Sequence, residues 1–331
     1  MRNTSEARPR ASILLLAYNQ AHTVEQAAES CFAQRCEPLE IVLSDDASSD
    51  DTFARLRRAA QAYRGPHTVV VRRNEANVGV GEHYNQLLAA SQGELLITAA
   101  GDDVSTPDRV ARLLQAWDAQ ACRADLIASH LIDMDPQGAL HDVIRVDDLA
   151  QVRSVHDWTR KRPYIVGAGH AFTRRIMERF GPLGPGVFYE DQVMVFRAIA
   201  SGGAITVDAP LVHYRRGGTS GQAVFDSAQH MRWWKQRRSG RERAEMEQLL
   251  ADARTAGCEA EVGAHLATAW ERVMYLERLS QCSSTAARWK TFRETTSLPS
   301  WWRLRKLLHV QFPQATHAMT QSLLKLRPNR R

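Results

Sequence analysis

The stretch ELLITAAGDDVSTPDR, residues Glu94–Arg109, predicts both the fold class and the chemistry of the chain. Residues 95–97 form a short apolar run that is typical of a buried strand in a parallel sheet. Small residues follow it, and then two adjacent acids, Asp102 and Asp103. Thr106-Pro107 is typical of a helix N-cap followed by a first helical position, and apolar residues then recur at helical spacing. We therefore expect two carboxylates at the carboxyl end of a strand, where ligands bind in open α/β sheets.

The same order of apolar strand, polar loop and helix occurs three more times in the first part of the chain. We expect these strands at residues 12–17, 39–44 and 68–71. Strands that alternate with helices pair in parallel through right-handed crossovers. The predicted fold class is therefore α/β, with a doubly wound, mostly parallel sheet.

The later part of the chain is less regular. A further strand is expected at residues 125–129, then a strand-like run at 164–169 and a helix over 170–180. From about Gly221 the composition indicates helices. The organisation that we predict is a flexible N-terminus at 1–10, an α/β domain at 11–220, and a helical C-terminal region with a basic amphipathic tail at 221–331.

Composition limits the classes of function. The chain has 331 residues, 44% of them hydrophobic, which is enough for one large domain and a smaller appendage. Its five cysteines form no CxxC pair and are odd in number, so we expect a reducing cytoplasm. No apolar run is long enough to span a bilayer. The net charge of +6 lies in the segment from Trp301 onward, with seven Lys or Arg and no acid, which argues against nucleic acid as a partner of the main domain.

A second acidic pair, Glu190 and Asp191, precedes an apolar helical face. We expect it near a helix N-terminus, where carboxylates also complement the helix dipole. A short strand then opens into a basic, glycine-rich loop with Arg215 and Arg216. Neighbouring segments thus supply oppositely charged groups.

Taken in order, these motifs resemble the inverting nucleotide-sugar glycosyltransferases of family 2, which have the GT-A fold. The resemblance covers residues 11–220. It rests on Ala17-Tyr18-Asn19, LSDDASSDDT at 43–52, Asn77-Val78-Gly79 with Asn85, GDDVSTPDR at 101–109, FYEDQ at 188–192 and LVHYRR at 211–216. The chain departs from the family at Ala100, where a further aspartate is frequent, at Tyr84, where an arginine is frequent, and at Ala17, where a small hydroxyl residue is usual.

The resemblance implies a role for each matching residue. Tyr18 and Asp46 would hold the nucleotide base, and Asp102 the ribose. Asp103 would ligate Mg²⁺ or Mn²⁺ on the diphosphate, with His213 as a second candidate ligand. Asp191, with Glu190 beside it, would be the general base. The expected nucleotide-sugar-binding residues are Ala17, Tyr18, Asn19, Asp45, Asp46, Asn77, Gly79, Asn85, Asp102, Arg215 and Arg216, and Ser220 would help to close the basic loop over the diphosphate.

The chemistry requires two separate acidic sites. A sugar diphosphate leaves as an anion, so a cation must neutralise oxygen charge while a carboxylate deprotonates the acceptor hydroxyl. A carboxylate bound to a metal must stay ionised and occupied. The base therefore has to come from another segment, and Glu190-Asp191 is the best candidate.

Plainer interpretations stay open at this point. Asp45 and Asp46 also suit a solvated turn and helix cap, and His213 also suits a structural role. The tail, with Trp301, Trp302 and leucines between basic residues, suits either an anionic membrane surface or a helix packed on the domain.

We therefore expect a metal-dependent inverting hexosyl- or deoxyhexosyltransferase that acts in surface polysaccharide assembly. Its partners would be a nucleotide-diphosphate sugar and a saccharide or lipid-linked saccharide. We expect it in the cytoplasm, with attachment to the inner membrane surface and homo-oligomerisation left open. The alternatives are a sugar nucleotidyltransferase, which would release pyrophosphate, and a non-catalytic receiver-like module, whose acids would follow the first strand.

Overall fold

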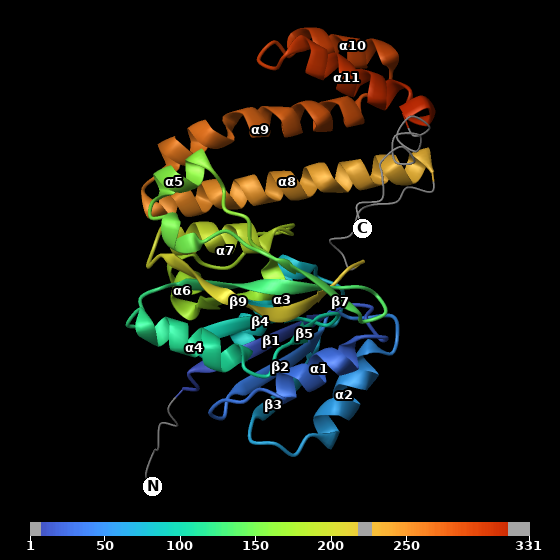
Figure 1. Cartoon of the computed structure of the whole chain (residues 1–331). Coiled ribbons are helices and arrows are strands. Elements are labelled where there is room, and N and C mark those ends of the chain that lie inside the picture. The colour runs from blue at the N-terminus through green and yellow to red at the C-terminus, as the bar shows by residue number, and fades with distance from the viewer. Residues whose placement is uncertain (1–7, 218–226, 317–331) are drawn as a thin grey trace. The chain divides into compact units, whose positions relative to one another are not determined.

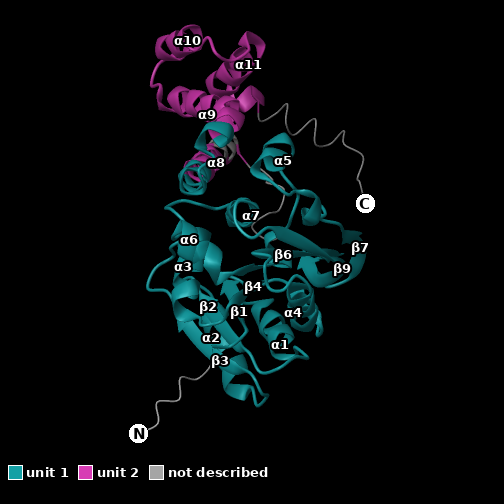
Figure 2. Ribbon diagram, turned by 90° about the vertical axis from the view of Figure 1, so that its left-hand side faces the viewer, with its two compact units in different colours: residues 1–221, 248–262 teal, residues 222–247, 263–331 magenta. Residues whose placement is uncertain are grey.

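The computed structural model describes residues 8–217 and 227–316, and the chain divides into two compact units (Figure 2). Unit 1 contains residues 1–221 and 248–262, and unit 2 contains residues 222–247 and 263–331. Two of the boundaries fall within long helices, one in α8 (Ala228–Ala256) and one in α9 (Glu259–Gln281).

Unit 1 is built on a mixed sheet with the strand order β3-β2-β1-β4-β8-β6-β9-β5, and β7 pairs with β6 (Figure 1). The long pairings, which join β3, β2, β1 and β4 and also β6 and β9, are parallel. The short strands β5, β7 and β8 pair antiparallel. The strands are β1 (Ala11–Ala17), β2 (Glu40–Asp45), β3 (Thr68–Arg73), β4 (Leu95–Ala100), β5 (Val104–Ser105), β6 (Leu126–Met134), β7 (Leu140–Ile144), β8 (His170–Thr173) and β9 (Ala204–Arg215).

Helices cover both faces of this sheet. Helices α1, α2 and α4 pack on the face formed by alternate strand residues such as Ile13, Ile41 and Ile97. Helix α3 lies on the other face, where the Tyr84 hydroxyl donates to Thr98 Oγ1 at 3.0 Å. The predicted doubly wound, mostly parallel sheet is confirmed. The helices and 3₁₀ turns are α1 (Val24–Phe32), α2 (Thr52–Ala62), α3 (Val80–Ala90), α4 (Arg109–Ala119), η1 (Leu149–Gln151), α5 (Val155–Arg160), η2 (Gly167–Gly169), α6 (Arg174–Phe180) and α7 (Glu190–Ile199).

The carboxyl ends of the first parallel strands meet at one edge of the sheet, and this edge carries both acidic pairs. Ala17 at the end of β1 lies opposite Asp45 at the end of β2, and β4 ends just before Gly101. A Cβ atom on Gly101 would lie 2.5 Å from Gln20 Oε1 and 3.0 Å from Ala17 Cβ. Ala17 and Gln20 thus approach the main chain at Gly101 closely, in keeping with the small residues before Asp102.

The structure differs from the prediction at residues 164–180. The strand is β8, His170–Thr173, and the helix α6 begins only at Arg174. Gly167–Gly169 form a 3₁₀ turn, and all four residues of β8 are buried because β8 pairs with both β4 and β6. Tertiary pairing thus overrides the local helical pattern.

The start of α4 also differs by two residues from the prediction. The helix begins at Arg109 with Asp108 at the N-cap position, and the Asp108 side chain makes no capping hydrogen bond. Thr106 instead uses its main-chain carbonyl, which accepts from the Arg109 amide at 3.1 Å. The two intervening residues are needed because β5 ends at Ser105, after pairing with β9.

Unit 2 is helical, as predicted for the C-terminal region. Besides its parts of α8 and α9 it contains α10 (Thr285–Glu294) and α11 (Ser300–Gln311). Tyr275, Leu279, Leu298 and Leu307 form its small core. The Tyr275 hydroxyl donates to the carbonyl of Arg303 at 2.9 Å. Within the described residues, no helix has the length and apolar character that crossing a membrane requires.

Candidate functional site

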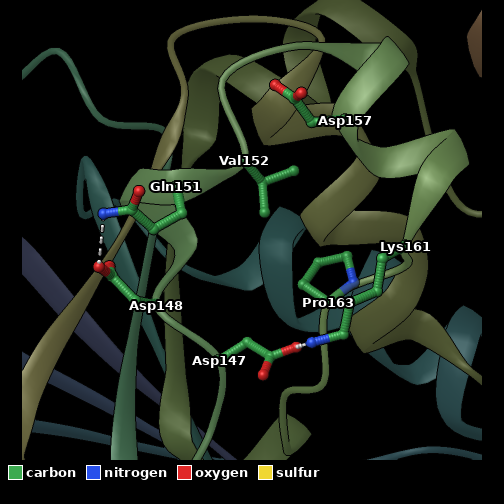
Figure 3. Close-up of a pocket in the computed structure, with 7 residues that line it drawn as sticks. All are labelled: Asp147, Asp148, Gln151, Val152, Asp157, Lys161 and Pro163. Carbon is green, nitrogen blue, oxygen red and sulfur yellow. Dashed lines mark hydrogen bonds and ion pairs between the residues drawn. The ribbon is translucent and has the colours of Figure 1, made fainter.

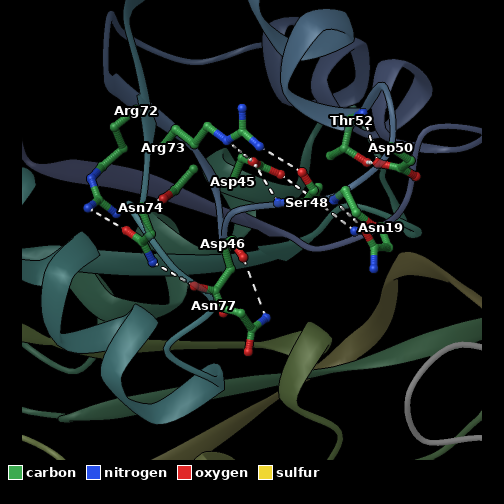
Figure 4. Close-up of polar contacts among 12 residues, drawn as sticks. Asn19, Asp45, Asp46, Ser48, Asp50, Thr52, Arg72, Arg73, Asn74 and Asn77 are labelled. Atoms are coloured by element: carbon green, nitrogen blue, oxygen red, sulfur yellow. Dashed lines mark hydrogen bonds and ion pairs between the residues drawn. The ribbon is translucent and has the colours of Figure 1, made fainter.

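The first acidic pair, Asp45-Asp46, is held by donors of its own chain (Figure 4). Asp45 is fully buried and accepts from the main-chain amide of Ser48 at 3.0 Å and from the Ser48 hydroxyl. Arg73 Nε forms an ion pair with Asp45 Oδ2 at 3.1 Å. These contacts close the turn that follows β2, so Asp45 acts on the shape of the loop.

Asp46 organises the next loop along the chain. Its carboxylate accepts from Asn74 Nδ2 at 2.7 Å and from the main-chain amides of Val78 and Gly79, each at 3.0 Å. Gly79 has a φ of 81°, a left-handed conformation that favours glycine. Asn77 donates to the Asp46 carbonyl at 3.4 Å. The Asn-x-Gly motif is therefore folded around Asp46.

The segment after β1 lies beside this turn. Ala17 is buried, and its carbonyl accepts from the Asp46 amide at 2.9 Å. Asn19 has a φ of 52° and bridges to the turn through Ser48 Oγ (2.8 Å) and the Ser49 amide (2.9 Å). Tyr18, by contrast, is 45% exposed. The edge thus presents an accessible aromatic ring on a rigid polar base.

The other acidic pair at this sheet edge, Asp102-Asp103, lies in a different environment. Asp103 is only 4% exposed, and burial, followed by the charge of Asp102, raises its pKa well above the ordinary value. Burial also raises the pKa of Asp102. The main-chain amide of Arg215 donates to Asp103 Oδ1 at 2.8 Å. The surroundings of this pair disfavour its negative charge, and a bound cation would offset that effect.

Arg215, the last residue of β9, lies directly against these acids. The Arg215 guanidinium donates to the Asp102 carbonyl at 3.0 Å and to Gln26 Oε1 at 2.7 Å, and Arg216 forms an ion pair with Asp133. His213 is the cross-strand partner of Val104. The predicted diphosphate contacts of both arginines stay predictions, and Ser220 lies outside the described residues.

The catalytic candidates lie at the first turn of α7. Burial, and then the charge of Asp191, raises the pKa of Glu190 to about 8. Glu190 is then mostly protonated at neutral pH, so Asp191 is the better proton acceptor of the pair. A Cβ atom on Gly167 would lie 3.1 Å from Glu190 Oε1 and 3.7 Å from Asp191 Oδ2. The η2 turn is therefore packed directly against both carboxyl groups.

Two buried residues to which the sequence motifs give no role, Tyr84 and Arg109, interact with groups of both acidic sites. Tyr84 is buried, and burial followed by the charge of Glu190 raises its pKa well above the ordinary value. Arg109 is 1% exposed and interacts electrostatically with Asp103 and Tyr84. The signal in the sequence is slight: Arg109 directly follows Pro107-Asp108 as the first residue of a helix. Asn85 bonds both main-chain groups of Leu183, at 2.8 and 2.9 Å, and so joins α3 to the loop before α7.

The donor set suits a metal that the substrate also ligates. Among the described residues no group of three His, Cys, Asp or Glu side chains is arranged to hold a metal by itself. Mg²⁺ is commonly bound by one or two carboxylates together with phosphate oxygens and water. Asp103, buried beside Asp102 with its pKa raised, fits that mode of binding.

A separate open pocket of about 320 Å³ lies on the segment between β7 and η2 (Figure 3). Lys161 Nζ bonds Asp147 Oδ2 at 3.0 Å across it. None of the predicted site residues lines this pocket. Its lining residues are Asp147, Asp148, Gln151, Val152, Asp157, Lys161 and Pro163.

Solved structures share the whole fold. S. aureus TarS 1–349, solved in complex with UDP-GlcNAc, has a TM-score of 0.58 at 15% identity, over 97% of this chain and 93% of that one. A mannosyltransferase of Pyrobaculum calidifontis, in complex with GDP-Man and Mn²⁺, has a TM-score of 0.53 at 18% identity, over 97% and 89%. At such identities the likeness shows the fold, and the expected GT-A fold is confirmed.

Curated relatives match parts of the chain. An uncharacterised protein of Mycobacterium tuberculosis is 34% identical over 96 residues, which are 29% of this chain and 27% of that protein. The succinoglycan biosynthesis protein ExoO of Rhizobium meliloti is 27% identical over 235 residues, which are 64% of this chain and 63% of that protein. The chain thus spans less than two thirds of either relative.

The model of the family described as Glycosyl transferase family 2 matches residues 12–181, which contain both strand-end acidic pairs. This match covers more than half of the 331 residues. The chain belongs to glycosyltransferase family 2.

Proposed function

We propose that this glycosyltransferase is metal-dependent and inverting, with Asp191 as its general base. The observation that carries the proposal is the meeting of two acidic sites around the same buried residues. Gly167 packs against Glu190 and Asp191, and its neighbour Ala168 accepts from buried Arg109 at 2.7 Å. Arg109 also donates to Ser105, two residues after Asp103, at 3.0 Å. Asp103, the candidate ligand of the cation, and Asp191, the candidate base, thus lie on separate segments that are joined through the same buried residues.

The donor in this proposal is a nucleotide-diphosphate sugar. Tyr18, exposed at the sheet edge, would stack on the base, with Asp46 and its loop beneath it. Asp102 would contact the ribose. Asp103, with His213, would hold Mg²⁺ or Mn²⁺. When bound, such a cation supplies positive charge to the diphosphate oxygens of the leaving group.

The transfer step needs a base on the far side of the sugar from the diphosphate. Asp191 takes the proton of the acceptor hydroxyl, whose oxygen then bonds to the anomeric carbon as the bond from that carbon to the diphosphate breaks. Attack from the opposite face inverts the configuration. Glu190, which holds its own proton at neutral pH, leaves Asp191 as the group that accepts one.

The acceptor in this proposal is a saccharide that runs along the pocket of Figure 3 toward α7. Pro163 in the pocket and Gly167 beside Glu190 are four residues apart, so their Cα atoms are at most about 14 Å from each other. Tyr164 lies between them with an exposed ring. Hexosyl or deoxyhexosyl transfer in polysaccharide assembly agrees with the relative ExoO, a succinoglycan biosynthesis protein. Tyr164→Ala should raise the KM for the acceptor and leave nucleotide binding unchanged.

Attachment to the cytoplasmic face of the inner membrane is a further part of the proposal, and α11 supports it. Trp301, Leu304, Leu308 and Phe312 are exposed and recur at helical spacing, and Arg305 lies beside them. An exposed apolar stripe with basic neighbours suits anionic lipid. Vesicles of phosphatidylglycerol should pull down the protein, and vesicles of phosphatidylcholine should not. The leucines at 323–326 lie outside the described residues.

Calorimetry tests the donor site first. Binding of UDP, GDP, dTDP and CMP is measured with Mn²⁺, with Mg²⁺ and with neither. A preference for one nucleoside diphosphate that depends on the metal supports the proposal. The matched transfer assay uses Asp191→Asn, which should keep nucleotide affinity and lose about 10² to 10⁴ in turnover. Near-normal turnover of this variant would remove Asp191 from the mechanism.

A further inference from the structure

Arg109 is a buried cation to which the transfer step above gives no role. It is the first residue of α4 and is 1% exposed. Burial lowers its pKa to about 10, so it still carries its charge at neutral pH. A charge this deep in a fold is costly and is normally offset by several close partners.

The partners of Arg109 are few. Its Nη1 donates to Ser105 Oγ at 3.0 Å, and its Nη2 donates to the carbonyl of Ala168 at 2.7 Å. Its Nε is buried and has no hydrogen-bond partner among the residues that the structure describes. Neither of its two hydrogen-bond acceptors is charged, so these two bonds offset only part of the cost of burying it.

Arg197 provides the contrast within the same unit. It is equally buried, but its guanidinium makes a two-point ion pair with Asp252, at 2.7 and 3.0 Å, and also donates to the Gly181 carbonyl at 2.9 Å. Arg197 is therefore satisfied as a structural group. The incomplete set of contacts around Arg109 indicates that its position serves something other than stability.

The two acceptors of Arg109 belong to the two halves of the site. Ser105 ends β5, two residues after Asp103, and Arg109 itself attracts the Asp103 carboxylate. Ala168 is the middle residue of the η2 turn, whose Gly167 lies against Glu190 and Asp191. The guanidinium thus connects the segment of the metal-binding candidate to the segment packed on the base.

The η2 turn has little room to move while Arg109 holds it. On its other side, Gly169 lies close to β6, where the Ser129 hydroxyl donates to the Gly169 carbonyl at 3.1 Å. A Cβ atom on Gly169 would lie 3.0 Å from the Ser129 carbonyl. Loss of the guanidinium would free the Ala168 carbonyl, and the turn could then shift toward or away from Glu190.

We propose that Arg109 is a positioning residue for sugar transfer, which fixes the η2 turn and thereby sets Glu190 and Asp191 relative to Asp103. This inference rests on the proposed role of Asp191 as base. Small displacements at a reacting centre cost about 10² in rate, so the effect should appear in turnover more than in donor binding.

Arg109→Lys tests the inference, because lysine keeps the charge but cannot reach both acceptors in a fork. We expect kcat to fall about 10²-fold, with the donor KM and the calorimetric affinity for the metal-nucleotide within about threefold of wild type. Ser105→Ala, which leaves the bond to Ala168, should lower kcat by no more than about threefold. Arg197→Lys is the matched control: it should lower the unfolding temperature while the folded fraction keeps kcat within about threefold.

The outcomes separate the inference from the proposed function. If Arg109→Lys keeps normal kcat, or loses no more kcat than Arg197→Lys, Arg109 is only structural. If only the donor KM rises, Arg109 acts on the donor and the positioning role is wrong. If wild type transfers no sugar, or Asp191→Asn turns over normally, the proposed function itself fails, whatever Arg109→Lys does.

Discussion

The two acidic pairs at the sheet edge look alike in sequence and differ in physical state. Asp45 and Asp46 are buried, but amides, a hydroxyl and a guanidinium of the chain surround their carboxylates. Asp102 and Asp103 are also withdrawn from water, yet burial raises the pKa of both, and the charge of Asp102 raises that of Asp103 further. Acids whose carboxylates have partners within the chain hold the loops of the site in shape. Acids whose charge the fold disfavours are available to bind a ligand.

The largest effect should come from neutralising the strained pair. Asp103→Asn should lower kcat by about 10² to 10³ because the carboxylate is the principal candidate ligand of the cation. Its stability at neutral pH should stay equal or rise, since a buried charge is removed. Transfer assays and thermal unfolding check this, with the exposed Asp108→Asn as control. If Asp103→Asn lost as much stability as Asp46→Ala, the two pairs would not differ in the way proposed.

The satisfied pair should behave in the opposite way. Asp46→Ala leaves Asn74 and the amides of Val78 and Gly79 without their acceptor, so we expect a loss of about 2 to 4 kcal/mol in unfolding free energy. Urea denaturation measures it. Asp51→Ala, an exposed acid in the same segment, should change stability by less than about 0.5 kcal/mol. If the two variants are equally stable, the Asp46 contacts do not hold the loop.

The sequence predicts the strand ends well because the parallel strands there are local apolar runs with polar residues directly after them. Asp45-Asp46 and Asp102-Asp103 were placed in this way, and Glu190-Asp191 was placed at a helix N-terminus, where α7 begins; the roles of these residues stay predictions. The strand β8 was missed because its four residues become a strand only through pairing with β4 and β6, which are distant in sequence.

The roles of Arg109 and Gly167 could not be predicted from the sequence for the same reason. Their importance comes from contacts with Ala168 and Glu190, which lie 59 and 23 residues further along the chain. A motif also could not show that the Asp46 carboxylate accepts its hydrogen bonds from Asn74, Val78 and Gly79. Spacing predicts which residues share an edge of the sheet. Only the fold shows which of their side chains already have hydrogen-bond partners within the chain.

A moderate effect is expected from Gly167→Ala. The added methyl group would lie 3.1 Å from Glu190 Oε1, so Glu190 must move by a few tenths of an ångström. We expect kcat to fall about tenfold, with nucleotide affinity unchanged, because the change affects the base and leaves the donor side intact. Gly240→Ala is the control, since a Cβ atom there meets nothing within 4 Å. Equal kcat values for both variants would show that the turn does not constrain the acids.

The smallest expected effect is a pH dependence of the unfolding temperature in the absence of any ligand. It compares acids with a raised pKa, such as Glu190, with Asp46. Glu190 has its pKa raised from 4.5 to about 8, so the folded protein keeps a proton that the unfolded chain releases, and stability falls as pH rises through this range. Buried His83 and His170, with pKa values lowered to about 4 and about 3, act in the opposite direction but only below about pH 6.5. Between pH 6.5 and 8 the raised acids therefore dominate, and the unfolding temperature of the metal-free protein should fall by about 2 to 4 °C. Glu190→Gln should flatten this slope, whereas Asp46→Asn should leave it as steep as in wild type. A slope that survives Glu190→Gln would mean that the strain lies elsewhere than at the first turn of α7.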